Sequence, residues 1–280
     1  MVLEHKSLFY KGKRIFESVA LGHFNRIPKL FDENEACFLF VEVGAFHMRT
    51  PDKLIAFASG DGMLAKCNNY YIEKTVADLQ VEEKNTKVLG AYFYPEIIKN
   101  LFNTDLSLSD FQSNYDLKKV NIDALMQHYL SSIYFLLDNP SIASDDMILT
   151  KLKELLLILS KSDTAPSIID FVSSLFKPLE YDFKTVIEKN IFSDLSLEEY
   201  AHLCSMSVST FKRHFKDIFQ DSPAHYIKLK RLKKAAELLK RTTDRITDIC
   251  YDCGFSDIGH FSKSFIAQYG CAPSEYRLQS

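Results

Sequence analysis

Residues 201–226 read AHLCSMSVSTFKRHFKDIFQDSPAHY, and residues 250–276 read CYDCGFSDIGHFSKSFIAQYGCAPSEY. Five aromatic or proline positions recur between the two runs at a constant offset of 50 residues. The matched pairs are Phe211 with Phe261, Phe215 with Phe265, Phe219 with Tyr269, Pro223 with Pro273, and Tyr226 with Tyr276. A constant offset over five positions indicates two copies of one supersecondary unit.

The first copy has the pattern of two short helices joined by a tight turn. Ser196, with Glu199 three residues later, forms a capping-box pattern at the start of the first helix. Ser207 is the expected N-cap of a second helix over residues 208–219. The expected buried stripe of that helix consists of Phe211, Phe215 and Ile218. The first copy therefore predicts a helix–turn–helix.

The opposite face of that second helix is polar and cationic. Its side chains at i, i+3, i+4 and i+7 are Ser209, Lys212, Arg213 and Lys216. An α-helix fits the major groove of DNA, where Arg and Lys can reach guanine edges or phosphate oxygens. The row is a candidate DNA-reading surface, and the alternative is an ordinary solvated helix face.

The second copy contains a C-x-x-C pair, Cys250 and Cys253, which alone suggests a metal or redox site. The pair is spaced to face a neighbouring helix, however, and a tetrahedral zinc site would need two more ligands. Gly254 permits a left-handed turn, and Ser256 is the expected cap of the next helix. The groove-facing end of that helix carries Ile258, Gly259, His260 and Lys263.

A long helix is expected between the two copies. AHYIKLKRLKKAAELLKRT (residues 224–242) supplies about 17 helical residues, or about 25 Å, and KLKRLKK within it holds five cations. Such a helix can hold two reading helices about one DNA turn apart. Candidate phosphate contacts are Lys228, Lys230 and Lys234. Arg231 could instead hold this helix to a subdomain through a buried ion pair.

Composition indicates a globular protein with an uneven distribution of charge. The 280 residues have 46% apolar and 25% charged content, and the first residues lack a signal-peptide pattern. We therefore expect a cytoplasmic protein, in which six cysteines stay reduced. Residues 181–280 hold 15 Lys+Arg and 13 Asp+Glu, a net charge of +2, whereas the preceding 180 hold 19 and 24, a net of −5. The C-terminal part is the part suited to a polyanion.

The N-terminal part predicts strands followed by helices. Short runs rich in Phe, Val and Ile occupy residues 1 to about 95, and turn signals separate them, which favours an antiparallel sandwich or barrel. The clearest runs are ACFLFVEV (36–43), AFHMRT (45–50), KLIAFAS (53–59) and GMLAKC (62–67). From about 95 to 175 the apolar spacing becomes helical. One stripe, which is either core or a dimer interface, comprises Ile148, Leu152, Leu155, Leu156 and Leu159.

Residues 184–277 resemble the DNA-binding domain of the AraC/XylS family of bacterial transcription regulators. The matching pieces are LSLEEYAHLCSMSVSTFKRHFK (195–216), SPAHYIKLKRLKKAAELL (222–239), ITDICYDCGFSDIGHFSKSF (246–265) and YGCAPSEYR (269–277). The resemblance implies an α+β protein with a jelly-roll (cupin-like) regulatory and dimerisation domain at 1–175. An all-α domain at 176–280 would hold two helix–turn–helix units joined by a long helix. The implied function is sequence-specific promoter binding, usually as an activator that contacts RNA polymerase.

The resemblance also places the base-reading positions. They fall on Ser209, Lys212 and Arg213 in the first unit, and on Ile258, Gly259, His260 and Lys263 in the second. The family usually has glycine where this chain has Ser205 and Gln220. We expect the fold to survive because serine can reach the left-handed conformation at modest cost. Ile258 and Gly259 cannot donate side-chain hydrogen bonds. Ile258 could touch a thymine methyl, and His260 and Lys263 could hold the backbone.

Other functions find less support in the sequence. A metal-dependent cupin enzyme would need clustered His and Glu, but the strands hold only His47, and His5 and His23 lie outside that pattern. Cys37 and Cys67 fall on predicted strands, where a free cysteine is usually a small hydrophobe and less often a redox group. No catalytic constellation, metal or cofactor is predicted.

Three questions about partners stay open. The N-terminal domain could bind a small apolar ligand in its barrel or a protein partner. A homodimer could form through the helices of residues 121–160. An alternative to the main interpretation is a non-DNA-binding antagonist or ligand-binding protein that retains the fold, supported by the missing glycines and by Ile258 and Gly259.

Overall fold

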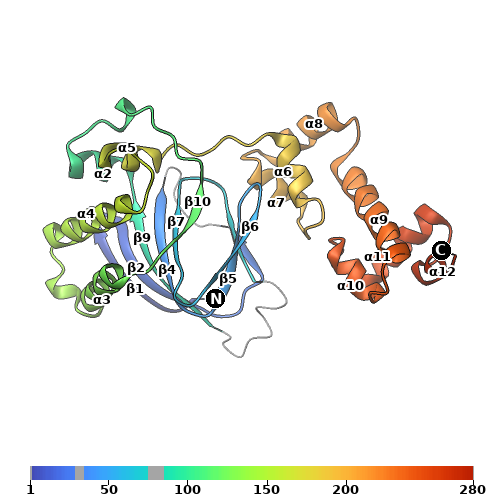
Figure 1. Cartoon of the computed structure of the whole chain (residues 1–280), viewed down its shortest axis with the longest axis horizontal. Coiled ribbons are helices and arrows are strands. Elements are labelled where there is room, and N and C mark those ends of the chain that lie inside the picture. The colour runs from blue at the N-terminus through green and yellow to red at the C-terminus, as the bar shows by residue number, and fades with distance from the viewer. Residues whose placement is uncertain (1, 29–34, 75–84, 280) are drawn as a thin grey trace. The chain divides into compact units, whose positions relative to one another are not determined.

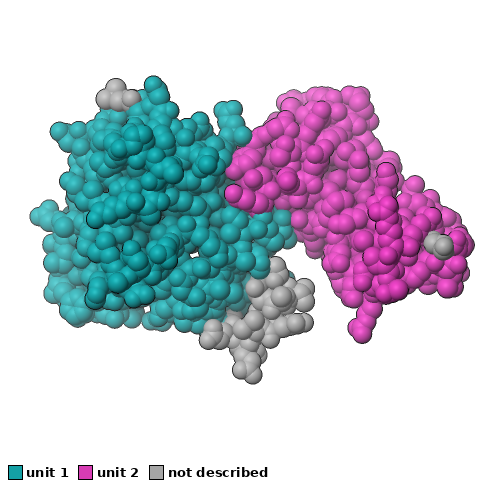
Figure 2. Space-filling model, in the orientation of Figure 1, with its two compact units in different colours: residues 1–50, 54–180 teal, residues 51–53, 181–280 magenta. Residues whose placement is uncertain are grey.

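The computed structural model describes residues 2–28, 35–74 and 85–279. The chain forms two compact units (Figure 2), one of residues 1–50 and 54–180 and the other of residues 51–53 and 181–280. We call them the N-terminal unit and the C-terminal unit. In the described parts of the chain, every strand lies in the first and the second contains only helices (Figure 1). The expected α+β class is confirmed.

The N-terminal unit is built on two antiparallel sheets. The larger has six strands in the order β1-β2-β9-β4-β7-β10, and the smaller has four in the order β3-β8-β5-β6. Their bounds are β1 (Val2–Tyr10), β2 (Lys13–Leu21), β3 (Arg26–Pro28), β4 (Ala36–Val43), β5 (Ala45–Arg49), β6 (Leu54–Ala58), β7 (Gly62–Ala65), β8 (Tyr71–Glu73), β9 (Thr86–Phe93) and β10 (Leu117–Val120). The two-sheet antiparallel arrangement agrees with the expected jelly roll.

The four clearest apolar runs of the sequence form β4, β5, β6 and β7. Two expectations about this region are wrong. β10 falls within residues 95–175, where only helices were expected, because LKKV is too short to show a period and becomes a strand by pairing with β7. Cys67 lies in a bend after β7 rather than on a strand, whereas Cys37 lies buried on β4.

Helices follow the sheets, as the spacing predicted. They are α2 (Pro95–Phe102), η1 (Leu106–Leu108), α3 (Ala124–Asp138), η2 (Pro140–Ile142), α4 (Asp145–Lys161) and α5 (Ile168–Ser174). α3 and α4 contact each other and pack on the β1–β2 end of the large sheet (Figure 1). The apolar stripe of α4 is fully buried in this core, with none of its five side chains more than 3% exposed. Of the two alternatives left open for that stripe, the structure supports core.

The C-terminal unit is a run of seven helices in the described residues. They are α6 (Phe183–Asn190), α7 (Leu197–Leu203), α8 (Val208–Phe219), α9 (Pro223–Arg241), α10 (Ile246–Asp252), α11 (Ile258–Tyr269) and α12 (Pro273–Leu278). The pairs α7–α8 and α10–α11 are the two predicted helix–turn–helix units. α9, 19 residues or about 28 Å long, connects them.

Candidate nucleic-acid interface

The first helix–turn–helix is shaped by local hydrogen bonds that the sequence predicted. The Ser196 backbone N–H donates to Glu199 at 2.7 Å, and the Glu199 N–H donates to the Ser196 hydroxyl at 3.2 Å, which completes the capping box. Ser205 holds the turn with a φ of 54°. Ser207 caps α8 by accepting from the Thr210 N–H at 3.2 Å. Short-range chemistry therefore fixes where α8 begins.

Aromatic packing fixes which face of α8 points outward. Phe211 and Phe215 are fully buried, and the ring of Phe183 on α6 lies 5.5 Å from the first and 6.1 Å from the second. Such contacts hold the helix against rotation about its axis. The opposite row, Ser209, Lys212, Arg213 and Lys216, is exposed along its whole length. Ile218, expected in the buried stripe, is half-buried.

The second helix–turn–helix repeats this construction. Phe261 and Phe265 of α11 are fully buried, as their counterparts in α8 are. The cap is Asp257 rather than the expected Ser256, because the Asp257 carboxylate accepts the N–H of His260 at 2.5 Å. Both residue types cap helices well, so sequence alone could not choose between neighbours.

The predicted readers of α11 separate into two kinds. Gly259, His260 and Lys263 are exposed. Ile258 is half-buried and packs against the core of the second helix–turn–helix, so it has a structural role that the sequence did not indicate.

The C-x-x-C pair lies inside that core. Cys250 and Cys253 are fully buried, whereas His260 is exposed. Burial raises the pKa of each thiol to about 11, which keeps the thiols protonated near neutral pH. Metal ligation and redox exchange both need the thiolate. Within the described residues there is no group of three or more His, Cys, Asp or Glu side chains placed to hold a metal ion.

The lysines of α9 differ in their surroundings. Lys228 is exposed. Lys230 lies over the ring of Tyr226, with the ammonium 5.2 Å from the ring centre, and half-buried Lys234 lies over Phe192 at 4.0 Å. Both lysines therefore make cation–π contacts within the protein.

Arg231 makes contacts that differ from the expected ion pair. Its Nε donates to the carbonyl of Ile191 at 2.8 Å, its NH1 to that of Gly254 at 2.7 Å and its NH2 to that of Ser193 at 2.5 Å. The partners are backbone carbonyls of both helix–turn–helix units. Carbonyl partners leave no mark in a sequence, which is why the sequence suggested a carboxylate.

A groove of about 560 Å³ runs alongside Arg231 between the two helix–turn–helix units. Residues of α7, α9 and α11 line it together with the N-caps of the first two helices, Ser196 and Ser222. Lys228 of α9 and His260 of α11 are among the lining residues. Lys228 was a predicted phosphate contact and His260 a predicted reader of the second unit. The fold thus places Lys228 and His260, which were predicted separately, in the same groove.

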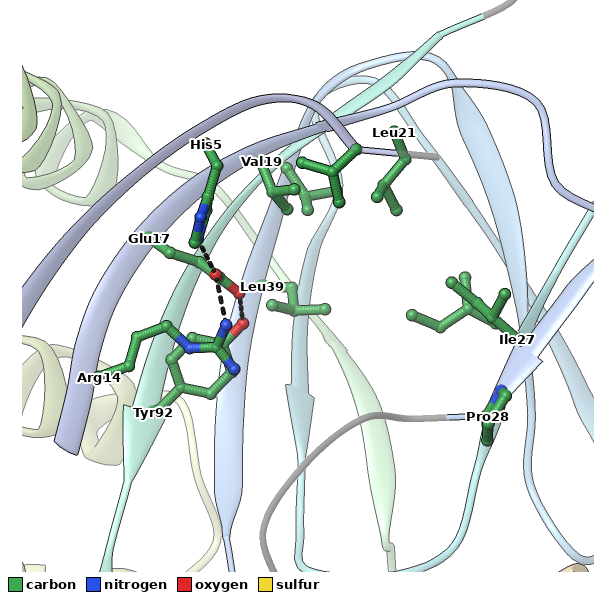
Figure 3. A pocket seen from close by; sticks show the side chains of 12 residues that line it. His5, Arg14, Glu17, Val19, Leu21, Ile27, Pro28, Leu39 and Tyr92 are labelled. Carbon is green, nitrogen blue, oxygen red and sulfur yellow. Dashed lines mark hydrogen bonds and ion pairs between the residues drawn. The ribbon is translucent and has the colours of Figure 1, made fainter.

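The N-terminal unit has a separate pocket of about 190 Å³ between its sheets (Figure 3). Its wall is mostly aliphatic, with Val19, Leu21, Ile27, Leu39 and Val88 among the lining residues. The polar lining side chains gather at one side of it in Figure 3.

Glu17 is the centre of that polar group. Its carboxylate accepts from Arg14 at 2.8 Å and from Tyr92, and lies 2.9 Å from His5. Burial, followed by the charge of Glu17, raises the pKa of Tyr92 well above its usual value. The sequence does not indicate this group, because its members come from three strands that are distant in the chain. Of its members, only His5 was weighed as a possible metal ligand.

Comparison with known proteins gives matches in both units. The family model described as "Helix-turn-helix domain" matches residues 200–279, and "ExsA N-terminal regulatory domain" matches residues 36–171. VirF of Yersinia enterocolitica, a virulence regulon transcriptional activator, is 28% identical over 160 residues, 56% of this chain and 58% of that protein. RhaS of Escherichia coli, an HTH-type transcriptional activator, is 31% identical over 140 residues, 50% of this chain and 48% of that protein.

This chain therefore spans about half the length of the curated relatives it matches. Among solved structures, ToxT from Vibrio cholerae covers 94% of this chain and 98% of its own, with a TM-score of 0.38 and 16% identity. Among the described residues, no helix is long and apolar enough to span a membrane.

Proposed function

We propose that this protein, a member of the AraC/XylS family of bacterial transcription regulators, binds promoter DNA sequence-specifically. We further propose that it activates transcription by RNA polymerase. One observation carries this proposal. The cationic row of α8 is exposed along its length on a helix whose other face is held by two fully buried phenylalanines. An ordinary solvated helix face would not require a second helix–turn–helix of the same construction, and α10 and α11 form one.

In the proposed complex α8 lies in the major groove. Arg213 has a planar fork of donors that matches the O6 and N7 acceptors of guanine, so it is the best candidate for direct base reading. Lys212 and Ser209 would contact neighbouring base edges, and Lys216, one turn further along, would contact phosphate. α11 would occupy the next major-groove segment with His260 and Lys263.

The groove beside Arg231 is the proposed path of the DNA backbone between the two reading helices. Lys228 and His260 both line it, and a backbone in that position would be within reach of a cation from α9 and a side chain from α11. Lys230 and Lys234, whose ammonium groups lie over aromatic rings, would then contact neighbouring phosphates.

The alternative, an antagonist that has lost DNA binding, has less support than the sequence suggested. Ser205 and Gln220 adopt the left-handed backbone that the family glycines would adopt, with φ values of 54° and 55°. The missing glycines therefore leave the fold intact. What remains for the alternative is the non-donating pair Ile258 and Gly259.

The test is a binding experiment with the full chain. A duplex is selected from a random pool, and its association constant is measured between 50 and 200 mM salt. We expect log K to fall linearly with log salt, by about a thousandfold or more over this range if six or more phosphates are contacted. A chain that selects no duplex, or binds without salt dependence, would rule out the proposed function. Transcription from a promoter bearing that site, with purified RNA polymerase, then distinguishes activation from repression.

We further propose that the N-terminal pocket is the effector site and that the effector is small and mostly apolar. Its aliphatic wall and volume of about 190 Å³ support this, since apolar cavities of that order hold benzene-sized molecules. Benzene should raise the thermal unfolding midpoint of the wild-type chain. Val19→Phe, which fills the pocket, should remove that response. An equal response in both chains would show that benzene binds outside the pocket and would contradict the proposal.

We also propose that the protein dimerises through α3 and α4. With the α4 stripe in the core, the residues available for this contact are the large apolar side chains that these helices and η2 expose. They are Leu125, Phe135, Ile142, Met147 and Leu157.

A further inference from the structure

The connecting helix α9 belongs to two separate cores. Near its start, the ring of Tyr226 lies 5.6 Å from Phe215 and 4.6 Å from Phe219, both on α8. From its middle onward, Leu232, Ala235 and Leu239 are buried in a cluster with residues of α10 and α11. Position 231 falls between the two sets. A single helix is therefore the covalent link between two independently packed reading units, and any twist or bend of it would change their relative position.

Arg231 adds a second link at that point. Its guanidinium binds Ile191 and Ser193, which precede α7 in the first unit, and Gly254, which forms the turn of the second. The guanidinium is planar, permanently charged and has its donors in a fixed geometry. Three simultaneous bonds to carbonyls of both units therefore fix their separation and also their relative orientation.

Gly254 brings the two backbones into direct contact at the same place. It has a φ of +82°, and a Cβ built on it would lie 2.7 Å from the Phe192 carbonyl oxygen and 3.1 Å from Nε of Arg231. Any other residue would force the turn of the second unit away from the first. Lys234 over the Phe192 ring lies beside this contact.

We propose that Arg231 and Gly254 form a clamp that holds α8 and α11 at one fixed offset. This clamp sets the spacing that the protein accepts between two half-sites, the DNA segments that α8 and α11 each contact. Arg231 is in this view a positioning residue rather than a DNA contact. The proposal rests on the proposed DNA-binding function. With the offset fixed in the free protein, binding of the first half-site delivers α11 to the second without further loss of freedom. DNA with a changed spacing would then have to be distorted.

The experiment compares spacing penalties. The duplex selected by the wild-type chain is footprinted, and two derivatives are made with one base pair inserted or deleted between the protected half-sites. The penalty is the ratio of the dissociation constants on altered and selected spacing. We expect at least a tenfold penalty for the wild type. Arg231→Ala and Gly254→Ala should bind the selected duplex more weakly and show penalties below about threefold.

Gly270→Ala is the matched control. Gly270 has nearly the same backbone, with a φ of +79°, but no atom lies within 4 Å of its built Cβ. It incurs the same left-handed strain without disturbing the clamp, so its penalty should equal that of the wild type. Penalties in Arg231→Ala and Gly254→Ala that also match the wild type would overturn the proposal.

Two further measurements separate a lost clamp from a lost fold or a lost function. Amide hydrogen exchange should increase at residues 191–195 and 253–255 in Arg231→Ala while the buried turns of α8 and α11 stay protected. If α8 and α11 lose protection as well, the spacing penalty is measured in Arg231→Lys instead, which keeps the positive charge but has a single donor nitrogen. A penalty equal to that of the wild type in Arg231→Lys would count against the clamp. If the wild-type chain selects no duplex at all, the proposed function fails and the clamp with it.

Discussion

Left-handed backbone at single residues ends helices in both copies of the repeat. Ser205 and Gly254 follow the first helix of each helix–turn–helix, and Gln220 and Gly270 follow the second. Each of these helix ends has matching hydrogen bonds in the two copies. The N–H of Gln220 reaches the Lys216 carbonyl at 2.9 Å, and that of Gly270 reaches Ile266 at 2.8 Å. The turn geometry is therefore set by the motif, and the first copy achieves it with residues that carry a Cβ.

Ser205→Gly should stabilise the protein by about 0.5–1 kcal/mol. Relief of left-handed strain gains about 1–2 kcal/mol, and the greater freedom of glycine in the unfolded chain offsets about half of that gain. Urea unfolding should show a higher midpoint with the same slope. Gln220→Gly should gain less, because it also loses the bond from its side-chain amide to the Asp217 carbonyl at 2.8 Å. A lower midpoint for Ser205→Gly would show that its hydroxyl matters more than its backbone strain.

Arg213→Ala and Lys216→Ala should weaken DNA binding in different ways. Loss of a base-reading Arg213 should cost about 1–3 kcal/mol and relax preference at one base pair. Loss of Lys216 should weaken binding evenly across sequences and reduce the salt slope by about one. Anisotropy titrations on the selected duplex and its single-base variants measure both. Lys184→Ala, an exposed cation on α6, should change neither property; equal effects from all three variants would mean that only net charge matters.

At the scale of helices and strands, elements with local signals were predictable. The capping box at Ser196, the Ser207 cap and the paired aromatic stripes are all encoded within one or two turns, so the sequence predicted α7, α8, α10 and α11. The cap of α11 was misplaced by one residue, since Ser256 and Asp257 are equally suitable. β10 was missed because four residues become a strand only through distant pairing with β7.

The features of the candidate site also fall into those that local sequence predicts and those that depend on tertiary contacts. The exposed row of α8 follows directly from helical periodicity, and the sequence predicted all four of its members. The contacts of Arg231 and the polar group at Glu17 depend on tertiary approach between distant segments. Backbone carbonyls carry no sequence signal, and neighbours from three strands are unrelated in the chain. Such features become visible only with the fold.

The C-x-x-C helix gives a prediction at this scale. Both thiols are buried and have a pKa raised to about 11, so iodoacetamide at pH 8 should modify Cys250 and Cys253 only after unfolding. Half-buried Cys67 and Cys271 should react first in the native protein, as peptide mapping would show. Because the pKa of these thiols is higher in the folded state, they stabilise the protein at pH values below their unfolded pKa near 9. This contribution is lost as the pH rises toward 11. Rapid native labelling of Cys250 would contradict the packed geometry.

At the scale of the whole molecule, self-association would couple the N-terminal unit to DNA binding. A dimer carries two C-terminal units, and binding of one raises the effective concentration of the other to the millimolar range on DNA with two sites. The exposed apolar side chains of α3 and α4 are the proposed contact. Phe135, in the second half of α3, is 59% exposed, although burial of a phenylalanine is worth about 1.5–3 kcal/mol.

Phe135→Glu should therefore convert the protein to a monomer. Sedimentation equilibrium should show a concentration-dependent dimer for the wild type and a single 32.2 kDa species for the variant. Because the changed side chain is on the surface, the unfolding free energy should stay within about 0.5 kcal/mol of the wild type when both are measured at concentrations low enough for the wild type to be monomeric. Affinity for a duplex with two sites should fall at least tenfold, while affinity for one site stays the same. Leu54→Glu, which alters an exposed apolar residue on β6, is the matched control and should remain dimeric. A dimeric Phe135→Glu chain would remove α3 from the interface, and a monomeric wild type would end the dimer proposal.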